Sequence, residues 1–423
     1  MRSNIITALD IGSQNIRVII AQQHKDNRLE VKGISVVPSQ GIERGIVRDI
    51  EKVSECIRKA ITDAETVADI KAQNIYTNIS GDHVRTAIAD GRISIPSISS
   101  NEPGEITSEH LEQVIEESKN IVKIQKGLDR CKILHSIPQS YAIDGHEDIF
   151  NPLNMNGFVL LARVCSVFAE VTPLRNLSKC IELSGYHIDP ENFVLNHIAI
   201  ANSVLSDDEK RLGCILMDIG GGTCDIALFN RSVLERILVV PMAGMNITED
   251  LAIGLKTTLS SAEQIKQDYG SACATSVDPS QDIEIEGISG RASTRKSVAL
   301  VSHVIQHRVE EMLSLCYNKA MDYYTPELVT AGIVLTGGTA NLRNIGEIVE
   351  KSFNLHVKIA SPDTSRLFGL VNQLDDPAYA TVVGLLYYAS NLEKEPKTGS
   401  FNLPNIQSVK ILDKLKKLLK DFT

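Results

Sequence analysis

Apolar and polar positions along this chain follow the two-residue period of strands in some stretches and the 3.6-residue period of helices in others. Alternating or β-branched apolar runs predict strands at residues 5–9, 16–21, 30–37, 74–80, 85–95, 132–143 and 158–171. Periodic apolar stretches predict helices at residues 46–64, 107–123, 173–183, 196–205, 248–254, 260–269, 297–323 and 378–390. The order of strands followed by helices restarts at Gly213, so we expect an α/β protein whose second half repeats the first.

Two segments far apart in the chain carry nearly the same motif. Residues 5–13 and residues 214–225 each read as an apolar strand, an aspartate (Asp10 or Asp218) and a glycine turn. A second strand follows each turn, at residues 17–21 and 225–229. Glycine lets the backbone turn tightly and point its N–H groups at an anion. An aspartate beside such a turn repels phosphate unless Mg²⁺ or its waters lie between them. Two such hairpins facing each other would clamp the phosphates of a nucleotide, which predicts an ATP site.

A third segment, residues 333–342, is another buried strand that opens through Gly337 and Gly338 into a predicted helix. A backbone without side chains allows a flat base and its ribose to lie against it. A single Asp-x-Gly turn would most simply be an ordinary hairpin, but three strand–glycine modules in one chain favour nucleotide binding. The chain has no Gly-Lys dipeptide and no G-x-G-x-x-G, so it lacks the motifs of the P-loop and of the dinucleotide-binding fold.

Composition fits a large protein of a reducing compartment. A chain of 423 residues with 43% hydrophobic residues can form two or more domains. Its eight cysteines show no C-x-x-C pairing, and several lie inside apolar strands, so we expect a reduced cytoplasm. No stretch reaches the roughly 18 uninterrupted apolar residues of a spanning helix, and Asp10 interrupts any signal-peptide core. The net charge of −10 argues against nucleic-acid binding.

Residues 408–423 differ from the rest of this acidic chain, because they carry five lysines against two aspartates. Their apolar residues fall on one face of an α-helix that is too short to span a bilayer. Residues 391–407 are polar and rich in Pro, Gly, Lys and Glu, as a flexible linker is. A helix docked on the protein itself or on a coiled-coil partner would have the same pattern, but we expect one that binds anionic membrane lipids. The residues expected at the lipid are Ile411, Leu412, Leu415, Lys416, Lys417, Leu418, Leu419 and Phe422.

Together these motifs resemble those of the actin, Hsp70 and sugar-kinase superfamily, which has two phosphate loops and an adenosine loop. Within that superfamily the chain closely resembles the bacterial cell-division FtsA family. The basic C-terminal segment fits the same family. The other segments that carry the resemblance, which spans about residues 5–390, are residues 41–47 (Gly-Ile-Glu-Arg-Gly-Ile-Val), 79–84 (Ile-Ser-Gly-Asp-His-Val), 207–213, 247–252, 262–270 and 290–291.

The resemblance implies an actin-like two-lobed fold, with ribonuclease H-like subdomains 1A and 2A and inserted subdomains 1C and 2B. The order of predicted elements independently suggests an insertion at residues 85–161, where the family carries 1C. The implied boundaries are 1–84 and 162–200 for 1A, 85–161 for 1C, 201–230 and 323–390 for 2A, 231–322 for 2B, 391–407 for the linker and 408–423 for an amphipathic membrane helix.

The resemblance also implies the residues of a site for ATP and Mg²⁺. The two glycine turns would hold the phosphates from two sides, and the aspartates would hold the metal through water. One further pair of residues would bind the ribose, and a third glycine segment would bind the base. The set is Gly12, Ser13, Gln14 and Asn15 with Gly220, Gly221, Gly222 and Thr223 for the phosphates, Asp10 and Asp218 for Mg²⁺, Glu263 and Lys266 for the ribose, and Gly337, Gly338 and Asn341 for the base. An exposed ion pair would explain the spacing of Glu263 and Lys266 equally well.

By the same resemblance, the protein would polymerise at the division site as a peripheral protein on the cytoplasmic side of the cell membrane. Subdomain 2B would bind the C-terminal peptide of the tubulin-like protein FtsZ and so anchor the FtsZ ring, with Arg291 and Arg295 as candidate contacts. A solvated loop would explain these two arginines equally well. Subdomain 1C would bind other divisome proteins. Alternatives of the same fold are a pilus-assembly relative, a sugar kinase and a chaperone ATPase, and the sequence leaves ATP hydrolysis open.

Overall fold

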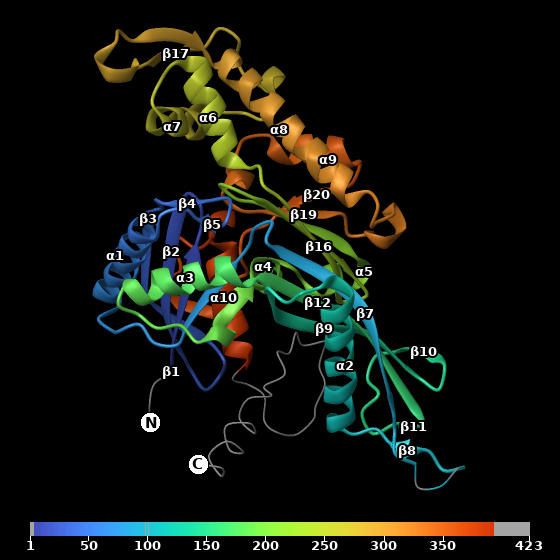
Figure 1. The fold of residues 1–423 in the computed structure, drawn as a ribbon. Coiled ribbons are helices and arrows are strands. Elements are labelled where there is room, and N and C mark those ends of the chain that lie inside the picture. The colour runs from blue at the N-terminus through green and yellow to red at the C-terminus, as the bar shows by residue number, and fades with distance from the viewer. Residues whose placement is uncertain (1–3, 98, 100, 393–423) are drawn as a thin grey trace. The chain divides into compact units, whose positions relative to one another are not determined.

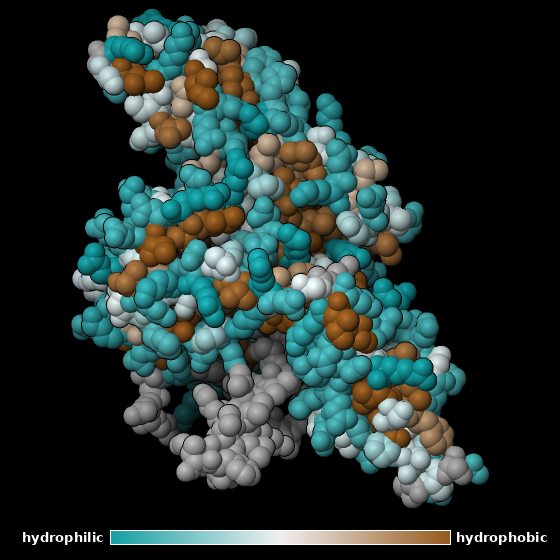
Figure 2. Space-filling view, viewed as in Figure 1, coloured by the Kyte–Doolittle hydropathy of each residue, from teal (hydrophilic) through white to brown (hydrophobic). Residues whose placement is uncertain are grey.

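The computed structural model describes residues 4–97, 99 and 101–392 of the chain. They form two compact units (Figure 1): the first contains the described residues of Met1–Val84 and Thr172–Glu395, and the second those of Arg85–Val171. Figure 2 shows mostly hydrophilic side chains on one face of the surface, interrupted by small apolar patches. Among the described residues, no helix is both long and apolar enough to cross a bilayer. The predicted membrane helix at 408–423 lies outside the described residues, as does the predicted linker apart from residues 391–392.

One sheet of the first unit has, in spatial order, the strands β13 (Phe193–Leu195), β6 (Ile75–Ile79), β1 (Asn4–Ile11), β2 (Asn15–Gln23), β3 (Leu29–Pro38) and β21 (Leu367–Gly369). The first three strands along the chain form an antiparallel meander, and β6 runs parallel to β1. Helix α1 (Ile50–Ala68) packs on β3 so closely that a Cβ on Gly33 would lie 2.2 Å from the Ala64 carbonyl oxygen. Glycine at this position therefore sets how near the helix lies to the sheet.

The second sheet of this unit repeats the arrangement, with β16 (Val233–Val240), β15 (Cys224–Asn230), β14 (Cys214–Ile219), β19 (Ile333–Thr336) and β20 (Val357–Ile359). Here too three consecutive strands form an antiparallel meander, and β19 runs parallel to β14. In both sheets the strand that carries the motif aspartate lies between its hairpin partner and a parallel strand. The predicted α/β protein with a repeated half is confirmed.

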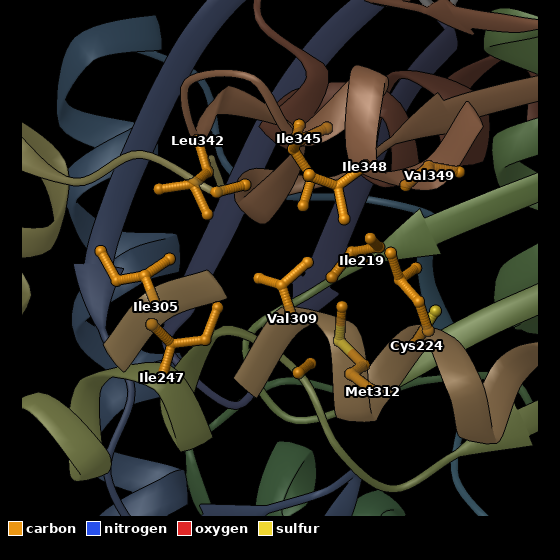
Figure 3. Packing of buried hydrophobic residues seen from close by; sticks show 14 of the residues in the cluster. Ile219, Cys224, Ile247, Ile305, Val309, Met312, Leu342, Ile345, Ile348 and Val349 are labelled. Carbon is orange, nitrogen blue, oxygen red and sulfur yellow. The ribbon is translucent and has the colours of Figure 1, made fainter. Parts of the chain in front are cut away.

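Helices pack on these sheets and on one another. Helices α4 (Asn196–Val204) and α10 (Ala380–Leu392) approach so closely that a Cβ on Gly384 would lie 1.9 Å from the Ala199 carbonyl oxygen. In the second half, Val309 and Met312 of α8 (Val298–Ala320) lie in a buried apolar core together with Ile345 of α9 (Ile345–Phe353) (Figure 3). Other elements of this unit are α3 (Val171–Leu183), α5 (Asp207–Leu212), α6 (Gly244–Leu255), α7 (Leu259–Tyr269) and the hairpin of β17 (Asp282–Ile285) and β18 (Thr294–Ser297).

Two predicted helices of this unit are wrong in part. Residues 46–47 do not begin a helix but form β5 (Ile46–Val47), which pairs with β4 (Ile42–Glu43). Helix α1 starts only after Asp49, whose Oδ1 accepts a hydrogen bond from the Lys52 N–H at 3.2 Å and so caps the helix. After Gly337 the chain makes a single 3₁₀ turn, and α9 begins later, after Asn344 adopts a left-handed φ of 61°.

The second unit is a four-stranded sheet covered by one long helix. In spatial order its strands are β10 (His146–Ile149), β9 (Cys131–Ile143), β12 (Val159–Glu170) and β7 (Val84–Ser94), and β8 (Gly104–Glu105) pairs with β11 (Asn156–Gly157). Helix α2 (Ser108–Lys126) packs on β12, and the Nδ1 of His110 accepts from the Thr107 N–H at 3.1 Å in its capping box. The boundary that we placed at residue 161 falls inside β12, which pairs with β9 as far as Glu170.

Candidate functional site

A pocket of the first unit opens where the two sheets present their Asp–Gly turns. The space within the pocket and at its open mouth amounts to about 930 Å³. The two turns contribute Gly12, Ser13, Gln14 and Asn15 on one side and Gly220, Gly221, Gly222 and Thr223 on the other, and the wall also includes Asp10, Asp218, Gly337 and Gly338. The structure therefore brings the three glycine segments of the sequence to one place.

The two turns share one backbone arrangement and lie close together. In each turn the first glycine N–H donates to the carbonyl three residues on, at 3.1 Å from Gly12 and at 3.0 Å from Gly220. A Cβ on Gly222 would lie 2.5 Å from the Oγ of Ser13, in the opposite turn. A side chain at Gly222 would therefore force the turns apart or fill the space between them, so glycine is required there.

Three carboxyl groups lie behind these turns. Asp10 and Asp218 are near the ends of β1 and β14, and Asp225 of β15 lies opposite Asp218 in the hairpin. The Nδ2 of Asn196 donates to Asp218 Oδ2 at 2.9 Å and to Asp225 Oδ2 at 2.8 Å. The Nδ2 of Asn78 donates to Asp10 Oδ1 at 2.9 Å and to Asn196 Oδ1 at 3.4 Å. A continuous chain of hydrogen bonds thus joins the acids of the two sheets.

These acids are buried with little positive charge around them. Burial raises the pKa of Asp10 to about 6, although the Arg17 guanidinium, 3.8 Å away, and the hydrogen bond from Asn78 lower it. Burial and then the charge of Asp225 raise the pKa of Asp218 to about 8, against the opposing hydrogen bond from Asn196. A cation among these groups would favour their ionised forms and would lower both pKa values.

The carboxyl groups fit a magnesium ion that is held partly through water. The Oδ1 of Asp225 is buried and has no hydrogen-bond partner. In the described part of the chain, no three acidic, histidine or cysteine side chains gather into a metal site of their own. Mg²⁺ keeps several waters and typically takes its remaining ligands from one or two carboxylates and from phosphate. This donor set therefore suits Mg²⁺ that arrives with a phosphate ligand, and Asp10 and Asp218 are the residues that would hold it.

The third glycine segment lies against the second hairpin. Gly337 has a φ of +92°, and a Cβ there would lie 2.1 Å from Asp218 Oδ1, so only glycine fits. Gly338 faces open space, because the nearest atom to a Cβ built on it would be the Ala378 Cβ, 3.9 Å away. Asn341 is not part of the pocket wall, and its Nδ2 donates instead to Asp376 Oδ1 at 2.8 Å. The two glycines therefore line the pocket, whereas the Asn341 side chain is held outside it by Asp376.

Glu263 and Lys266 form a polar cluster beside the pocket. The Nζ of Lys266 donates to Glu263 Oε2 at 2.7 Å, to Thr248 Oγ1 at 2.8 Å and to the Gly244 carbonyl at 3.0 Å. The Gly244 N–H donates in turn to the Gly220 carbonyl at 3.1 Å, which connects the cluster to the second glycine turn. Burial lowers the pKa of Lys266, against the charge of Glu263. The pair is partly buried, but neither side chain is part of the pocket wall.

The predicted partner contacts lie on the surface of the first unit. Arg291 and Arg295 are both exposed, and Arg295 of β18 is paired with Glu284 of β17 in the backbone register. An exposed position is compatible with a peptide contact and with a solvated loop alike. The predicted lipid-facing residues between 411 and 422 lie outside the described residues.

Comparisons with known proteins identify the family. The family model described as cell division protein FtsA matches residues 215–384, and that of the SHS2 domain inserted in FtsA matches residues 81–168. The cell division protein FtsA of Neisseria meningitidis serogroup B is 33% identical over 401 residues, which cover 93% of each chain. This chain belongs to the FtsA family of cell-division proteins. The FtsA of Pseudomonas aeruginosa, 31% identical, matches 98% of this chain and 97% of its own, and that of Escherichia coli K12, 31% identical, matches 91% and 90%.

Several solved structures have a similar fold. A chain of the PilM–PilN type IV pilus biogenesis complex has a TM-score of 0.62 at 13% identity, covering 93% of this FtsA-family chain and all of its own. MreB5 of Spiroplasma citri bound to AMPPNP has a TM-score of 0.52 at 15% identity, with 93% and 98% covered. The MamK double helical filament has 0.51 at 13%, with 93% and 99% covered. At these identities the likeness concerns the fold alone, and it confirms the actin-like architecture.

Several residues that line or support this pocket were not predicted from the sequence. Asp225 could have been predicted from the sequence. Once the glycine turn of the hairpin is placed, the antiparallel register puts Asp225 opposite Asp218. Asn78 and Asn196 carry no local signal, since they approach each other only in the folded chain. Arg17 also lines the pocket, and its guanidinium lies 5.5 Å from the centre of the Tyr379 ring. A basic residue in a strand that follows a glycine turn is a signal that could have been used.

Proposed function

We propose that this FtsA-family protein binds Mg·ATP in the pocket between its two Asp–Gly turns. The observation that carries the proposal is the meeting of two glycine turns, each with a buried aspartate behind it, at one pocket. The raised pKa values of Asp10 and Asp218 support it, because carboxyl groups short of positive charge gain most from a divalent cation. MreB5, a neighbour in fold, is described as bound to AMPPNP, which supports a nucleotide as the ligand here.

Within this proposal each group has a separate role. The backbones of the two turns hold the phosphates, Asp10 and Asp218 hold Mg²⁺ through water, and the base lies against Gly337 and Gly338. Glu263 and Lys266 reach the ribose by exchanging part of their mutual hydrogen bonding for bonds to the ligand. Asn341 reaches the base in the same way, by giving up its hydrogen bond to Asp376.

Asp218→Ala tests the clamp. Removing a carboxyl that acts on Mg²⁺ should weaken binding of Mg·ATP by roughly tenfold or more, about 1.4 kcal/mol, and should change binding of metal-free ATP far less. Isothermal titration calorimetry with Mg²⁺ and with a chelator measures both. Asp208→Ala, at an exposed aspartate of α5, is the matched control. Equal affinity for Mg·ATP in the wild type and in Asp218→Ala would remove the clamp.

We further propose that the protein polymerises on the cytoplasmic side of the cell membrane at the division site, anchors the FtsZ ring there and helps to recruit the divisome. Family membership supports a division role, and a neighbour described as a double helical filament supports self-assembly. In this proposal FtsZ binds residues 231–322 through Arg291 and Arg295, other division proteins bind residues 85–161, and anionic lipids bind residues 408–423. Weak ATPase activity is compatible with this role.

The competing functions find less support. A pilus role would rest on the likeness to a chain of the PilM–PilN complex, and 13% identity supports a shared fold only. No described feature favours a sugar kinase or a chaperone. Electron microscopy of the full chain on anionic lipid monolayers, with and without ATP, tests the assembly proposal. Filaments that form on the lipid with ATP support it, and monolayers that stay bare under all conditions contradict it.

A further inference from the structure

Both chain connections between the two compact units begin at the wall of the nucleotide pocket. The first unit ends its first segment at Val84, directly after His83, and resumes at Thr172, directly before Pro173. His83 and Pro173 both line the pocket, and so does Leu177, one turn further along α3. A ligand that touches this end of the pocket therefore acts next to the residues at which the second unit is joined to the first.

Close backbone contacts connect this end of the pocket to the phosphate turns. The N–H of Gly45, in the β4–β5 hairpin, donates to Ser13 Oγ at 3.4 Å, and a Cβ on Gly45 would lie 2.1 Å from the Ser80 carbonyl oxygen. Ser13 also lies against Gly222 of the second turn. Contacts therefore run without a gap from the second phosphate turn, through Ser13 and Gly45, to the turn that carries Ser80 and His83.

Ser80 and His83 give this end of the pocket the chemistry of an anion site. The Oγ of Ser80 is buried and has no hydrogen-bond partner. His83 is 4% exposed, and its ring packs so closely on Gly81 that a Cβ there would lie 2.6 Å from Nδ1. A hydroxyl and an imidazole N–H both donate hydrogen bonds to phosphate oxygens. The wall of the pocket also includes the apolar residues Ile42, Val47, Pro173 and Leu177.

We propose that Ser80 and His83 bind the terminal phosphate of ATP, and that the two chain connections to the second unit thereby respond to which nucleotide is bound. The inference rests on the proposed nucleotide function. In this proposal the base lies against Gly338, the phosphates lie between the two glycine turns, and the terminal phosphate reaches Ser80 and His83, whose turn contacts the Ser13 turn through Gly45. ADP is one phosphate shorter, so it leaves both residues without this ligand. The pocket then distinguishes ATP from ADP at the point where the second unit is joined.

The first test is nucleotide binding to the full chain with Mg²⁺, using a non-hydrolysable ATP analogue and ADP. A lost hydrogen bond to a charged group predicts that His83→Ala weakens binding of the analogue by roughly tenfold and leaves ADP nearly unchanged. Ser80→Ala should weaken the analogue in the same selective way. His83→Gln keeps a donor and should restore most of the affinity. His187→Ala, at an exposed histidine of the first unit, should bind both nucleotides as the wild type does.

The second test is hydrogen exchange by mass spectrometry on the same variants. In the wild type, peptides that cover residues 80–88 and 170–178 should exchange more slowly with the ATP analogue than with ADP. The difference should disappear in His83→Ala and persist in His187→Ala. An unchanged difference in His83→Ala, or an equal loss of affinity for both nucleotides in His83→Ala and His83→Gln, would overturn the inference. A wild type that binds neither nucleotide would instead overturn the proposed function.

Discussion

Asn196→Asp tests the chain of hydrogen bonds that joins the acids of the two sheets. The Asn196 side chain is buried, and its amide donates to Asp218 and Asp225 at 2.9 and 2.8 Å. The substitution keeps the size of the side chain but replaces both donors by a fourth carboxyl group. A hydrogen bond to a neutral acceptor contributes about 1 kcal/mol and one to a charged acceptor about 2 kcal/mol. We therefore expect the free energy of unfolding of the first unit to fall by about 3 kcal/mol.

Differential scanning calorimetry of the full chain measures this change. For a unit of this size, a loss of about 3 kcal/mol lowers Tm by roughly 5 °C. Asn202→Asp adds the same charge to the same helix, at a partly exposed position, and should leave Tm nearly unchanged. Mg²⁺ with ATP should recover part of the loss in Asn196→Asp, because a cation offsets the added negative charge. Equal shifts of Tm in the two variants would refute the network as a source of stability.

Three further predictions concern other parts of the chain. Deleting residues 408–423, or changing Leu415 and Leu419 to Glu, should abolish co-sedimentation with anionic liposomes while nucleotide binding survives, and a shortened protein that still pellets contradicts the anchor. Arg291→Glu should weaken binding of a purified FtsZ C-terminal peptide in a fluorescence titration, and unchanged affinity excludes this arginine as a contact. Burial lowers the pKa of His135 to about 4, so stability is complete above the unfolded pKa of about 6.5 and falls as the pH drops towards 4, by up to about 3 kcal/mol. Urea unfolding of His135→Gln should lose less stability over that interval, and equal losses contradict this origin.

The repeated hairpins could be predicted because their causes are local. An apolar strand, an aspartate and a glycine turn determine strand direction and turn position within a dozen residues, and the buried strands β1 and β14 follow that pattern. The start of α1 was predicted too early, because residues 46–47 are as apolar as a first helical turn. Their pairing with residues 42–43 is a tertiary feature of the β4–β5 hairpin, and Asp49 was the local signal that should have set the helix start.

The predicted contacts of the nucleoside were harder to place, because they depend on competing partners. Asn341 follows the glycine segment in sequence, yet its amide is held by Asp376, which also caps a short 3₁₀ turn. Glu263 and Lys266 lie one helical turn apart, as predicted, but the folded chain adds Thr248 and the Gly244 carbonyl as partners for the ammonium group. Spacing along a helix predicts which side chains are neighbours, whereas the contacts of a buried polar group are chosen by the whole fold.

The side-chain amides of Asn78 and Asn196 explain how buried carboxyl groups can be kept hydrogen-bonded without a bound cation beside them. These residues are 118 positions apart in the sequence and meet only because β6 lies beside β1 while α4 packs against both β6 and β14. An amide satisfies the hydrogen-bonding needs of a buried carboxyl group without neutralising its charge. A lysine at either position would form a permanent ion pair and compete with any cation brought by a nucleotide. Neutral donors instead leave the pKa values of Asp10 and Asp218 raised, at about 6 and about 8, so that the missing positive charge is left for the ligand to supply.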